Sequence, residues 1–309
     1  MKNVYFIGIG GIGMSAIARY YNHAGYNVSG YDRTPSKLTA KLEQEGISIH
    51  YTSDISYVPA DVEETLVIYT PAIPADMEEL VYVKEKGYRL IKRSRALGEI
   101  ASGQKCLGVA GTHGKTSTST MLAHLFIHSG TGCSAFLGGI SKNYHSNLLL
   151  SRNPVLVAEA DEFDRSFLQL FPDVAVITST DADHLDIYGN ASTMREAFAE
   201  FASQIKENGA LILKKGVEVA LDEQGGKGDG NEAGQQYGGG REAAHGGTGL
   251  LGDAVVGLDG PNLLHHFLAG LLLLLLCLGV QFLLGLLGLF LLAAEVVGQL
   301  VLHRHGVGA

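Results

Sequence analysis

A lysine, a threonine and a serine follow two glycines in the segment Gly111-Thr112-His113-Gly114-Lys115-Thr116-Ser117. Residues of these types in this order can hold a nucleoside triphosphate. The backbone N–H groups of such a loop face the phosphate oxygens, the lysine adds a positive charge, and the threonine hydroxyl can ligate Mg²⁺. The spacing differs from the usual P-loop, because the first glycine of that pattern would fall at Val109. We therefore predict that this loop binds triphosphate, with Lys115 and Thr116 as its chemical groups.

A strand and a helix must flank this loop if it is to hold phosphate. The apolar run 106–110 predicts a buried strand, and residues 119–126, which are apolar at helical spacing and are followed by Gly130, predict a helix. The positive end of the helix dipole then points at the phosphates. An ordinary glycine turn would explain Gly111 and Gly114, but it would not explain a Lys-Thr pair where the helix starts.

A second glycine-rich segment, Gly8-Ile9-Gly10-Gly11-Ile12-Gly13-Met14-Ser15, follows a predicted strand at residues 4–7. A helix that ends near Gly25 and a second strand at residues 27–32 come next, with Asp32 at the end of that strand. This is the G-x-G-x-x-G pattern in a βαβ context: the glycines admit a diphosphate, and the carboxylate can accept a hydrogen bond from a ribose or a base. An NAD-dependent oxidoreductase is therefore one alternative, although it leaves Lys115 and Thr116 unexplained.

Acidic residues follow two apolar runs in the second half of the chain. Residues 155–158 lead into Glu159, and residues 174–178 lead into a segment that contains His184. Ligands of open α/β sheets bind at the carboxyl ends of the strands. Because Mg²⁺ beside a triphosphate needs further ligands, we predict a metal site formed by Thr116, Glu159 and His184.

Strands and helices alternate along the chain, with further predicted strands at residues 65–70 and 89–91. This predicts an α/β protein with parallel sheets: a Rossmann-like domain at residues 1–102 and a P-loop ATPase-type domain at 103–309, joined by a hinge near residue 103. A length of 309 residues suffices for two cores. The net charge of −9 argues against nucleic-acid binding. Three cysteines without paired spacing predict neither disulfides nor a zinc site, and they favour the cytoplasm.

The composition changes after about residue 215. No Ile, Ser or Met occurs beyond that point, and an unbroken leucine run at 271–276 lies in a stretch without Asp, Glu, Lys or Arg between Asp259 and Glu295. Three interpretations stay open: a membrane anchor, one or two buried helices, or residue identities that differ from those of the natural chain. The loss of three common residue types favours the last, and a membrane partner is the least favoured.

With these motifs in view, the first 215 residues resemble the Mur ligases. The resemblance is carried by residues 6–15, 111–116, 159–167 and 183–186. It implies an ATP- and Mg²⁺-dependent ligase of peptidoglycan synthesis that joins L-alanine to UDP-N-acetylmuramate through an acyl phosphate. A family member that recycles muropeptides shares the 111–116 loop but differs in its N-terminal glycine motif, so it ranks second.

The same resemblance implies a role for each matching residue. Lys115 would hold the β- and γ-phosphates of ATP, Thr116 and Glu159 would ligate magnesium, and His184 would serve a second metal ion. The UDP-sugar would be bound by Gly8, Gly10, Gly11, Ile12, Gly13, Met14 and Ser15, with Asp32 and Thr70 near the uridine. His113 belongs to the ATP loop, but the sequence indicates no role for its ring.

The chain departs from the family pattern in three places. Thr178-Ser179 stands where the family has Thr-Asn, and Leu263 and His266 stand where two adenine-binding asparagines are expected. Because the sequence ends at Ala309, we expect no equivalent of the C-terminal domain that in this family binds the incoming amino acid. A nucleotide-binding fragment without catalysis is therefore a further alternative.

Overall fold

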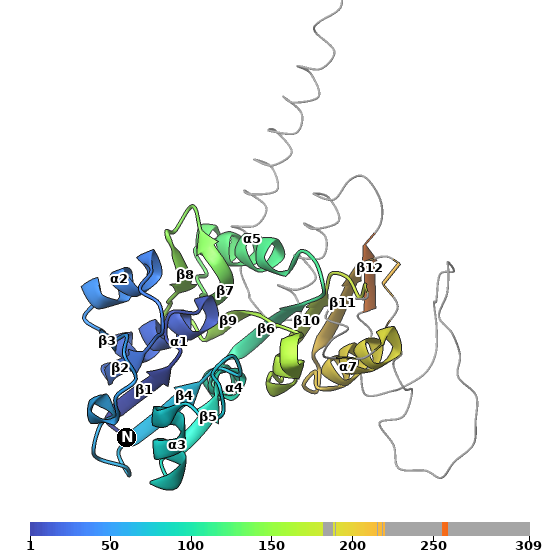
Figure 1. Ribbon diagram of the computed structural model, residues 1–309. Coiled ribbons are helices and arrows are strands. Elements are labelled where there is room, and N and C mark those ends of the chain that lie inside the picture. The colour runs from blue at the N-terminus through green and yellow to red at the C-terminus, as the bar shows by residue number, and fades with distance from the viewer. Residues whose placement is uncertain (182–187, 189, 215, 218, 220–254, 259–309) are drawn as a thin grey trace, which may run out of the picture.

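The computed structural model describes residues 1–181, 188, 190–214, 216–217, 219 and 255–258, and these form two β-sheets with their helices (Figure 1). The first sheet is parallel throughout, with the strand order β3-β2-β1-β4-β5. Its strands are β1 (Asn3–Ile7), β2 (Asn27–Tyr31), β3 (Ser48–His50), β4 (Thr65–Tyr69) and β5 (Arg89–Lys92). The helical elements are α1 (Ile12–His23), α2 (Lys37–Gln44), η1 (Ile55–Tyr57), α3 (Glu78–Glu85) and α4 (Arg93–Ala101).

The second sheet has the strand order β12-β11-β10-β6-β9-β7-β8. Its strands are β6 (Lys105–Ala110), β7 (Ser134–Ser141), β8 (Ser146–Leu149), β9 (Val155–Glu159), β10 (Val174–Ile177), β11 (Ala210–Lys214) and β12 (Val255–Leu258). The helical elements are α5 (Lys115–His128), η2 (Phe163–Gln169) and α7 (Ala191–Ser203). Each strand predicted from the sequence is present, with its ends within one residue of the predicted ones.

The second sheet has one antiparallel edge strand, because β8 runs antiparallel to β7. Only residues 142–145 separate the two strands. A connection that short can join neighbouring strands only as an antiparallel hairpin, since a parallel pair needs a crossover of a dozen or more residues. Every other strand pair in this sheet is parallel.

The central strands are buried because both faces of a parallel sheet are covered. Residues 4–7 of β1 have no exposed surface, and in β6 the side chains of Cys106, Leu107, Val109 and Ala110 are equally buried. The functional loops leave the carboxyl ends of these two central strands. Within the described part of the chain, no helix has the length and the apolar character to cross a membrane; the leucine-rich run lies outside that part.

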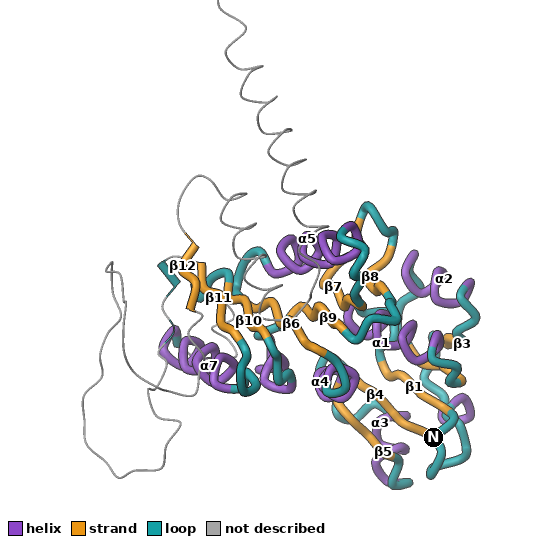
Figure 2. The backbone as a smooth tube through the Cα atoms, turned by 180° about the vertical axis from the view of Figure 1, so that it is seen from behind, coloured by secondary structure: helices purple, strands orange, loops and turns teal. Residues whose placement is uncertain are grey.

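The β7–β8 hairpin joins the two halves of the molecule by packing against α1 (Figure 2). Asn147 of β8 has no exposed surface; its amide donates to the Ile12 carbonyl at 2.6 Å and to Ser15 Oγ at 2.9 Å. The buried guanidinium of Arg19 donates to the Asn147 side-chain oxygen. A second contact between the halves is made by α4 and η2. The glycine loop is therefore fixed relative to the second sheet on two sides.

Candidate functional site

The loop between β6 and α5 has a backbone that only glycine adopts without strain at two positions. Gly111 has φ +129° and Gly114 has φ +84°. A Cβ atom at Gly111 would overlap Thr178 Oγ1. Gly114 immediately precedes α5 and has no side chain with which to cap it. The N–H groups of the first turn of α5 therefore have no side-chain cap and are available to an anion.

Two residues after β10 brace this loop. Thr178 Oγ1 donates to the carbonyls of Ala110 at 3.1 Å and His113 at 2.5 Å. Ser179 Oγ accepts from the His113 N–H at 2.8 Å and lies 2.9 Å from Thr112 Oγ1. The His113 ring is two-thirds exposed, and its Nε2 lies 3.8 Å from Asp181 Oδ2. The loop thus uses His113 through its backbone, while its ring faces solvent.

Lys115 is held on the inner side of the loop. Its Nζ donates to the Gly111 carbonyl at 2.7 Å and lies 2.8 Å from both carboxylate oxygens of Glu162. Glu162 has no exposed surface. This residue belongs to the 159–167 motif, but the sequence indicated no role for it. The only feature of the sequence that could have pointed to Glu162 is its position three residues after Glu159.

Glu159, at the end of β9, is brought to the start of α5 as predicted. Its carboxylate accepts from Thr116 Oγ1 at 2.9 Å, from the Gly138 N–H at 2.8 Å and from Ser119 Oγ at 3.4 Å. A hydroxyl and a carboxylate are the hard oxygen ligands that Mg²⁺ prefers, so these two residues fit that ion. His184, the third predicted ligand, lies outside the described residues, among which no group of three or more His, Cys, Asp or Glu forms a metal site.

The N-terminal glycine loop is shaped by Asp32 and by close packing. Asp32 accepts from the Gly10 N–H at 2.7 Å and from the Thr34 N–H at 3.0 Å. Gly8 has φ +90°, and a Cβ there would lie 2.7 Å from Thr70 Cγ2. Gly11 precedes α1 without a side-chain cap, so the N-terminus of that helix is also available to an anion.

A cleft of about 900 Å³ extends from the N-terminal glycine loop to Glu159, and residues 111–117 of the phosphate loop are not among those that line it. It begins at the glycine loop and reaches Glu159 and Asp161 at the edge of the second sheet. The residues predicted to bind the UDP-sugar that line it are Gly8, Gly11, Ile12, Gly13, Met14, Asp32 and Thr70. Gly10 and Ser15 do not line the cleft. The Gly10 N–H donates a hydrogen bond to Asp32, and the Ser15 side chain is buried against Asn147.

Arg93, which was not among the residues predicted from the sequence, also lines the cleft. Its Nη2 lies 3.0 Å from Asp161 Oδ2, across the junction between the two halves. A Cβ at Gly13 would come within 2.8 Å of Arg93 Nη1, so the guanidinium lies directly against the glycine loop. This puts a positive charge beside the predicted diphosphate site. No local motif marks Arg93, because its partners are distant in the sequence.

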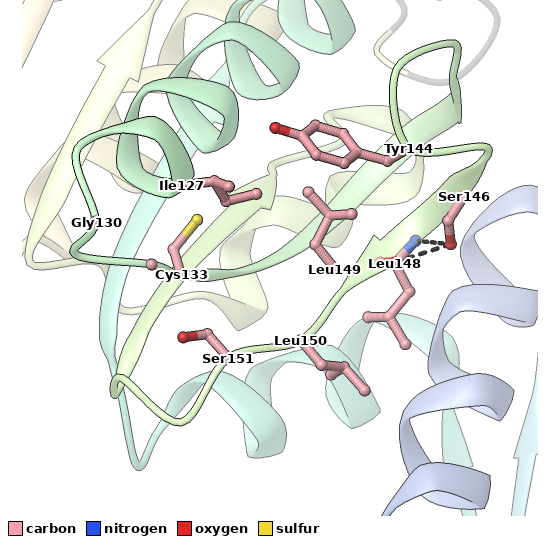
Figure 3. Close-up of a pocket in the computed structure, with 10 residues that line it drawn as sticks. Ile127, Gly130, Cys133, Tyr144, Ser146, Leu148, Leu149, Leu150 and Ser151 are labelled. Atoms are coloured by element: carbon pink, nitrogen blue, oxygen red, sulfur yellow. Dashed lines mark hydrogen bonds between the residues drawn. The ribbon is translucent and has the colours of Figure 1, made fainter.

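A second pocket of about 450 Å³ lies at the other end of α5 from the phosphate loop (Figure 3). Side chains of Ile127, Cys133, Tyr144 and Leu149 line it, and no predicted site residue does so. Burial raises the pKa of the Cys133 thiol to about 12. Because a thiol reacts as the thiolate, this cysteine is inert near neutral pH.

Two domain descriptions of one family match this chain. The description "Mur ligase family, catalytic domain" matches residues 3–105, and "Mur ligase middle domain" matches residues 109–224. The chain belongs to the Mur ligase family. The predicted α/β class with parallel sheets is confirmed.

Two of the similar curated proteins carry the same name. The UDP-N-acetylmuramate–L-alanine ligase of Porphyromonas gingivalis strain W83 is 56% identical over 223 residues, which cover 71% of this chain and 49% of the relative. The ligase of the same name from Flavobacterium johnsoniae is 51% identical over 230 residues, covering 72% and 51%. The chain therefore spans about half the length of these relatives.

Solved structures of two family members resemble the fold. UDP-N-acetylmuramate-alanine ligase MurC from Thermotoga maritima has a TM-score of 0.62 at 30% identity, with 70% of this chain and 49% of that chain covered. UDP-N-acetylmuramate:L-alanyl-gamma-D-glutamyl-meso-diaminopimelate ligase from Neisseria meningitides has a TM-score of 0.63 at 26% identity, with 70% and 72% covered.

Proposed function

We propose that this chain provides the UDP-sugar and ATP sites of a ligase that joins L-alanine to UDP-N-acetylmuramate in peptidoglycan synthesis. One observation carries the proposal: a single cleft leads from the N-terminal glycine loop to Glu159, which is hydrogen-bonded to Thr116 of the phosphate loop. A sugar nucleotide held at one end could extend its reacting carboxylate toward a triphosphate at the other. The names of the curated relatives supply the substrates.

On the ATP side, Lys115 and the N–H groups at the start of α5 would bind the β- and γ-phosphates. Thr116 and Glu159 would hold Mg²⁺, which neutralises charge on the transferring phosphoryl group when it is bound. His184 stays our proposed ligand for a second ion. Catalysis in such a site depends on positioning and charge, and the contacts of Glu159 with Thr116 and Gly138 keep its carboxylate in place.

On the sugar-nucleotide side, the N-terminus of α1 and the glycine backbone would bind the diphosphate, with Arg93 adding positive charge. Asp32 and Thr70 would lie beside the uridine. Gly10 and Ser15 would act indirectly, because their contacts hold the loop in shape. We also propose the domain division at residue 102, a cytoplasmic location, and L-alanine as the second substrate.

The test is calorimetric titration with UDP-N-acetylmuramate, with NADH as the control ligand. Binding of the sugar nucleotide alone is expected, and binding of NADH alone would contradict the proposal. Lys115→Ala should abolish ATP binding while UDP-N-acetylmuramate still binds, because the two sites lie on different sheets. Phosphate release with all substrates present distinguishes a catalyst from a nucleotide-binding fragment. A requirement for a muropeptide in place of L-alanine would favour the recycling ligase.

A further inference from the structure

The ammonium group of the phosphate-loop lysine is already paired with a carboxylate. The Lys115 side chain is only 15% exposed, and its Nζ lies 2.8 Å from both oxygens of a carboxylate, that of Glu162, which has no exposed surface at all. The Gly111 carbonyl accepts a further hydrogen bond from the same ammonium group. An ammonium group has three N–H donors. Glu162 and Gly111 therefore fix its orientation, and with it the direction of any N–H left for another partner.

Glu162 is itself held in place by backbone contacts. Its carbonyl accepts from Tyr188 Oη at 2.6 Å and from the Arg165 N–H at 3.0 Å. Burial, followed by the charge of Glu162, raises the pKa of Tyr188 to about 12, so its hydroxyl stays a donor at neutral pH. The segment that follows turns sharply, with φ +52° at Asp164 and +53° at Arg165. The carboxylate therefore has a defined position from which it reaches Lys115.

The charge of this carboxylate opposes nucleotide binding. Lys115 can offer its full positive charge to a triphosphate only if it moves away from Glu162, and separating a buried ion pair costs free energy. If the lysine stays, the negative carboxylate lies beside the negative phosphates and weakens their attraction to it. In either case the phosphates and Glu162 compete for one ammonium group.

We propose that Glu162 is a positioning residue that sets nucleotide affinity: it clamps Lys115 in the empty site and shares it with the phosphates in the filled one. The clamp lowers the affinity of the site for nucleotide. It also holds the Lys115 ammonium group in position for phosphoryl transfer. The nucleotide part of this inference rests on the proposed function, whereas the clamp itself is a property of the protein without ligand.

The experiment compares the full chain with Glu162→Gln, which keeps the shape of the side chain and removes its charge. Glu162→Asp serves as a second variant, because its carboxylate falls one methylene short of Lys115. The matched control is Asp164→Asn, which neutralises an acid of the same segment that pairs with Lys92 instead. Thermal unfolding confirms that each variant is folded.

The first readout needs no nucleotide. Acetylation of Lys115 by an amine-reactive ester, followed by mass spectrometry and normalised to the exposed Lys37, should become several-fold faster in Glu162→Gln and Glu162→Asp. It should be unchanged in Asp164→Asn. Equal rates in all four proteins would overturn the clamp.

The second readout is calorimetric binding of a non-hydrolysable ATP analogue, together with turnover. Loss of the charged competitor in Glu162→Gln should tighten binding roughly tenfold and lower kcat by about the same factor. A side chain that only supports the fold would not tighten binding, so weaker binding by folded Glu162→Gln refutes the proposal. If the unchanged protein binds no analogue, the proposed function fails, and the acetylation rates still decide whether Glu162 holds Lys115.

Discussion

Replacement of Asn147 by alanine tests how the two halves of the molecule are joined. The Asn147 amide lies at the end of the β7–β8 hairpin, is fully buried, and makes hydrogen bonds to Ile12, Ser15 and Arg19 of α1. Alanine removes all three at once. It leaves behind a backbone carbonyl, a hydroxyl and a guanidinium that is 6% exposed, with no space for bulk water to replace the amide.

The expected cost follows from these three groups. A buried polar group that loses its partner costs about 1–3 kcal/mol, and a charged one costs more. The Ile12 carbonyl also accepts from Ser15 Oγ, and Arg19 also pairs with Glu45 at 2.6 Å, so neither loses every partner. We therefore expect a loss of about 3–5 kcal/mol. For a protein of this size that lowers the melting temperature by roughly 10 °C.

Differential scanning calorimetry measures this change, and Asn153→Ala is the matched control. Asn153 follows the same hairpin in the chain. Its side-chain amide donates a single hydrogen bond, to the Thr131 carbonyl within the same half of the molecule. Its loss should cost about 1 kcal/mol. If Asn147→Ala cost no more than Asn153→Ala, the buried network would not be what joins the halves, and the reasoning would be refuted.

Two further predictions concern histidines. His113→Ala should change stability by less than about 0.5 kcal/mol in urea unfolding, because only its backbone braces the loop; a loss above 2 kcal/mol would show that the ring matters. Burial, followed by the neighbouring His128, lowers the pKa of His124. The unfolded chain then takes up this proton more readily, so stability should fall as the pH drops below about 6.5. His124→Gln should reduce that fall between pH 7 and pH 5, and an unchanged profile would contradict it.

The sequence predicted the parts of this site that are local in the chain. Each glycine loop lies between a strand and a helix that are its immediate neighbours, and Glu159 ends a strand that an apolar run predicts. Hydrophobic periodicity and strand-end placement were therefore enough to locate them. The meeting of Glu159 with Thr116 follows from the adjacency of β6 and β9, which the parallel architecture makes possible.

Other features depend on contacts that no local pattern encodes. Glu162 reaches Lys115 across 47 residues, and Arg93 reaches Asp161 across 68. The hairpin escaped prediction because its first strand contains two adjacent glycines, which weaken the β signal. Its contact with α1, made through Asn147, belongs to tertiary packing rather than to propensity. The roles of the predicted binding residues stay predictions until ligand is added.

Gly138 has a consequence for inhibitors of this protein. Its N–H holds Glu159, it lines the cleft, and any Cβ at this position would overlap the Glu159 carboxylate. A larger residue at position 138 would displace the Glu159 carboxylate, so a compound that packs on this bare stretch of backbone would contact a position where enlargement disturbs Glu159.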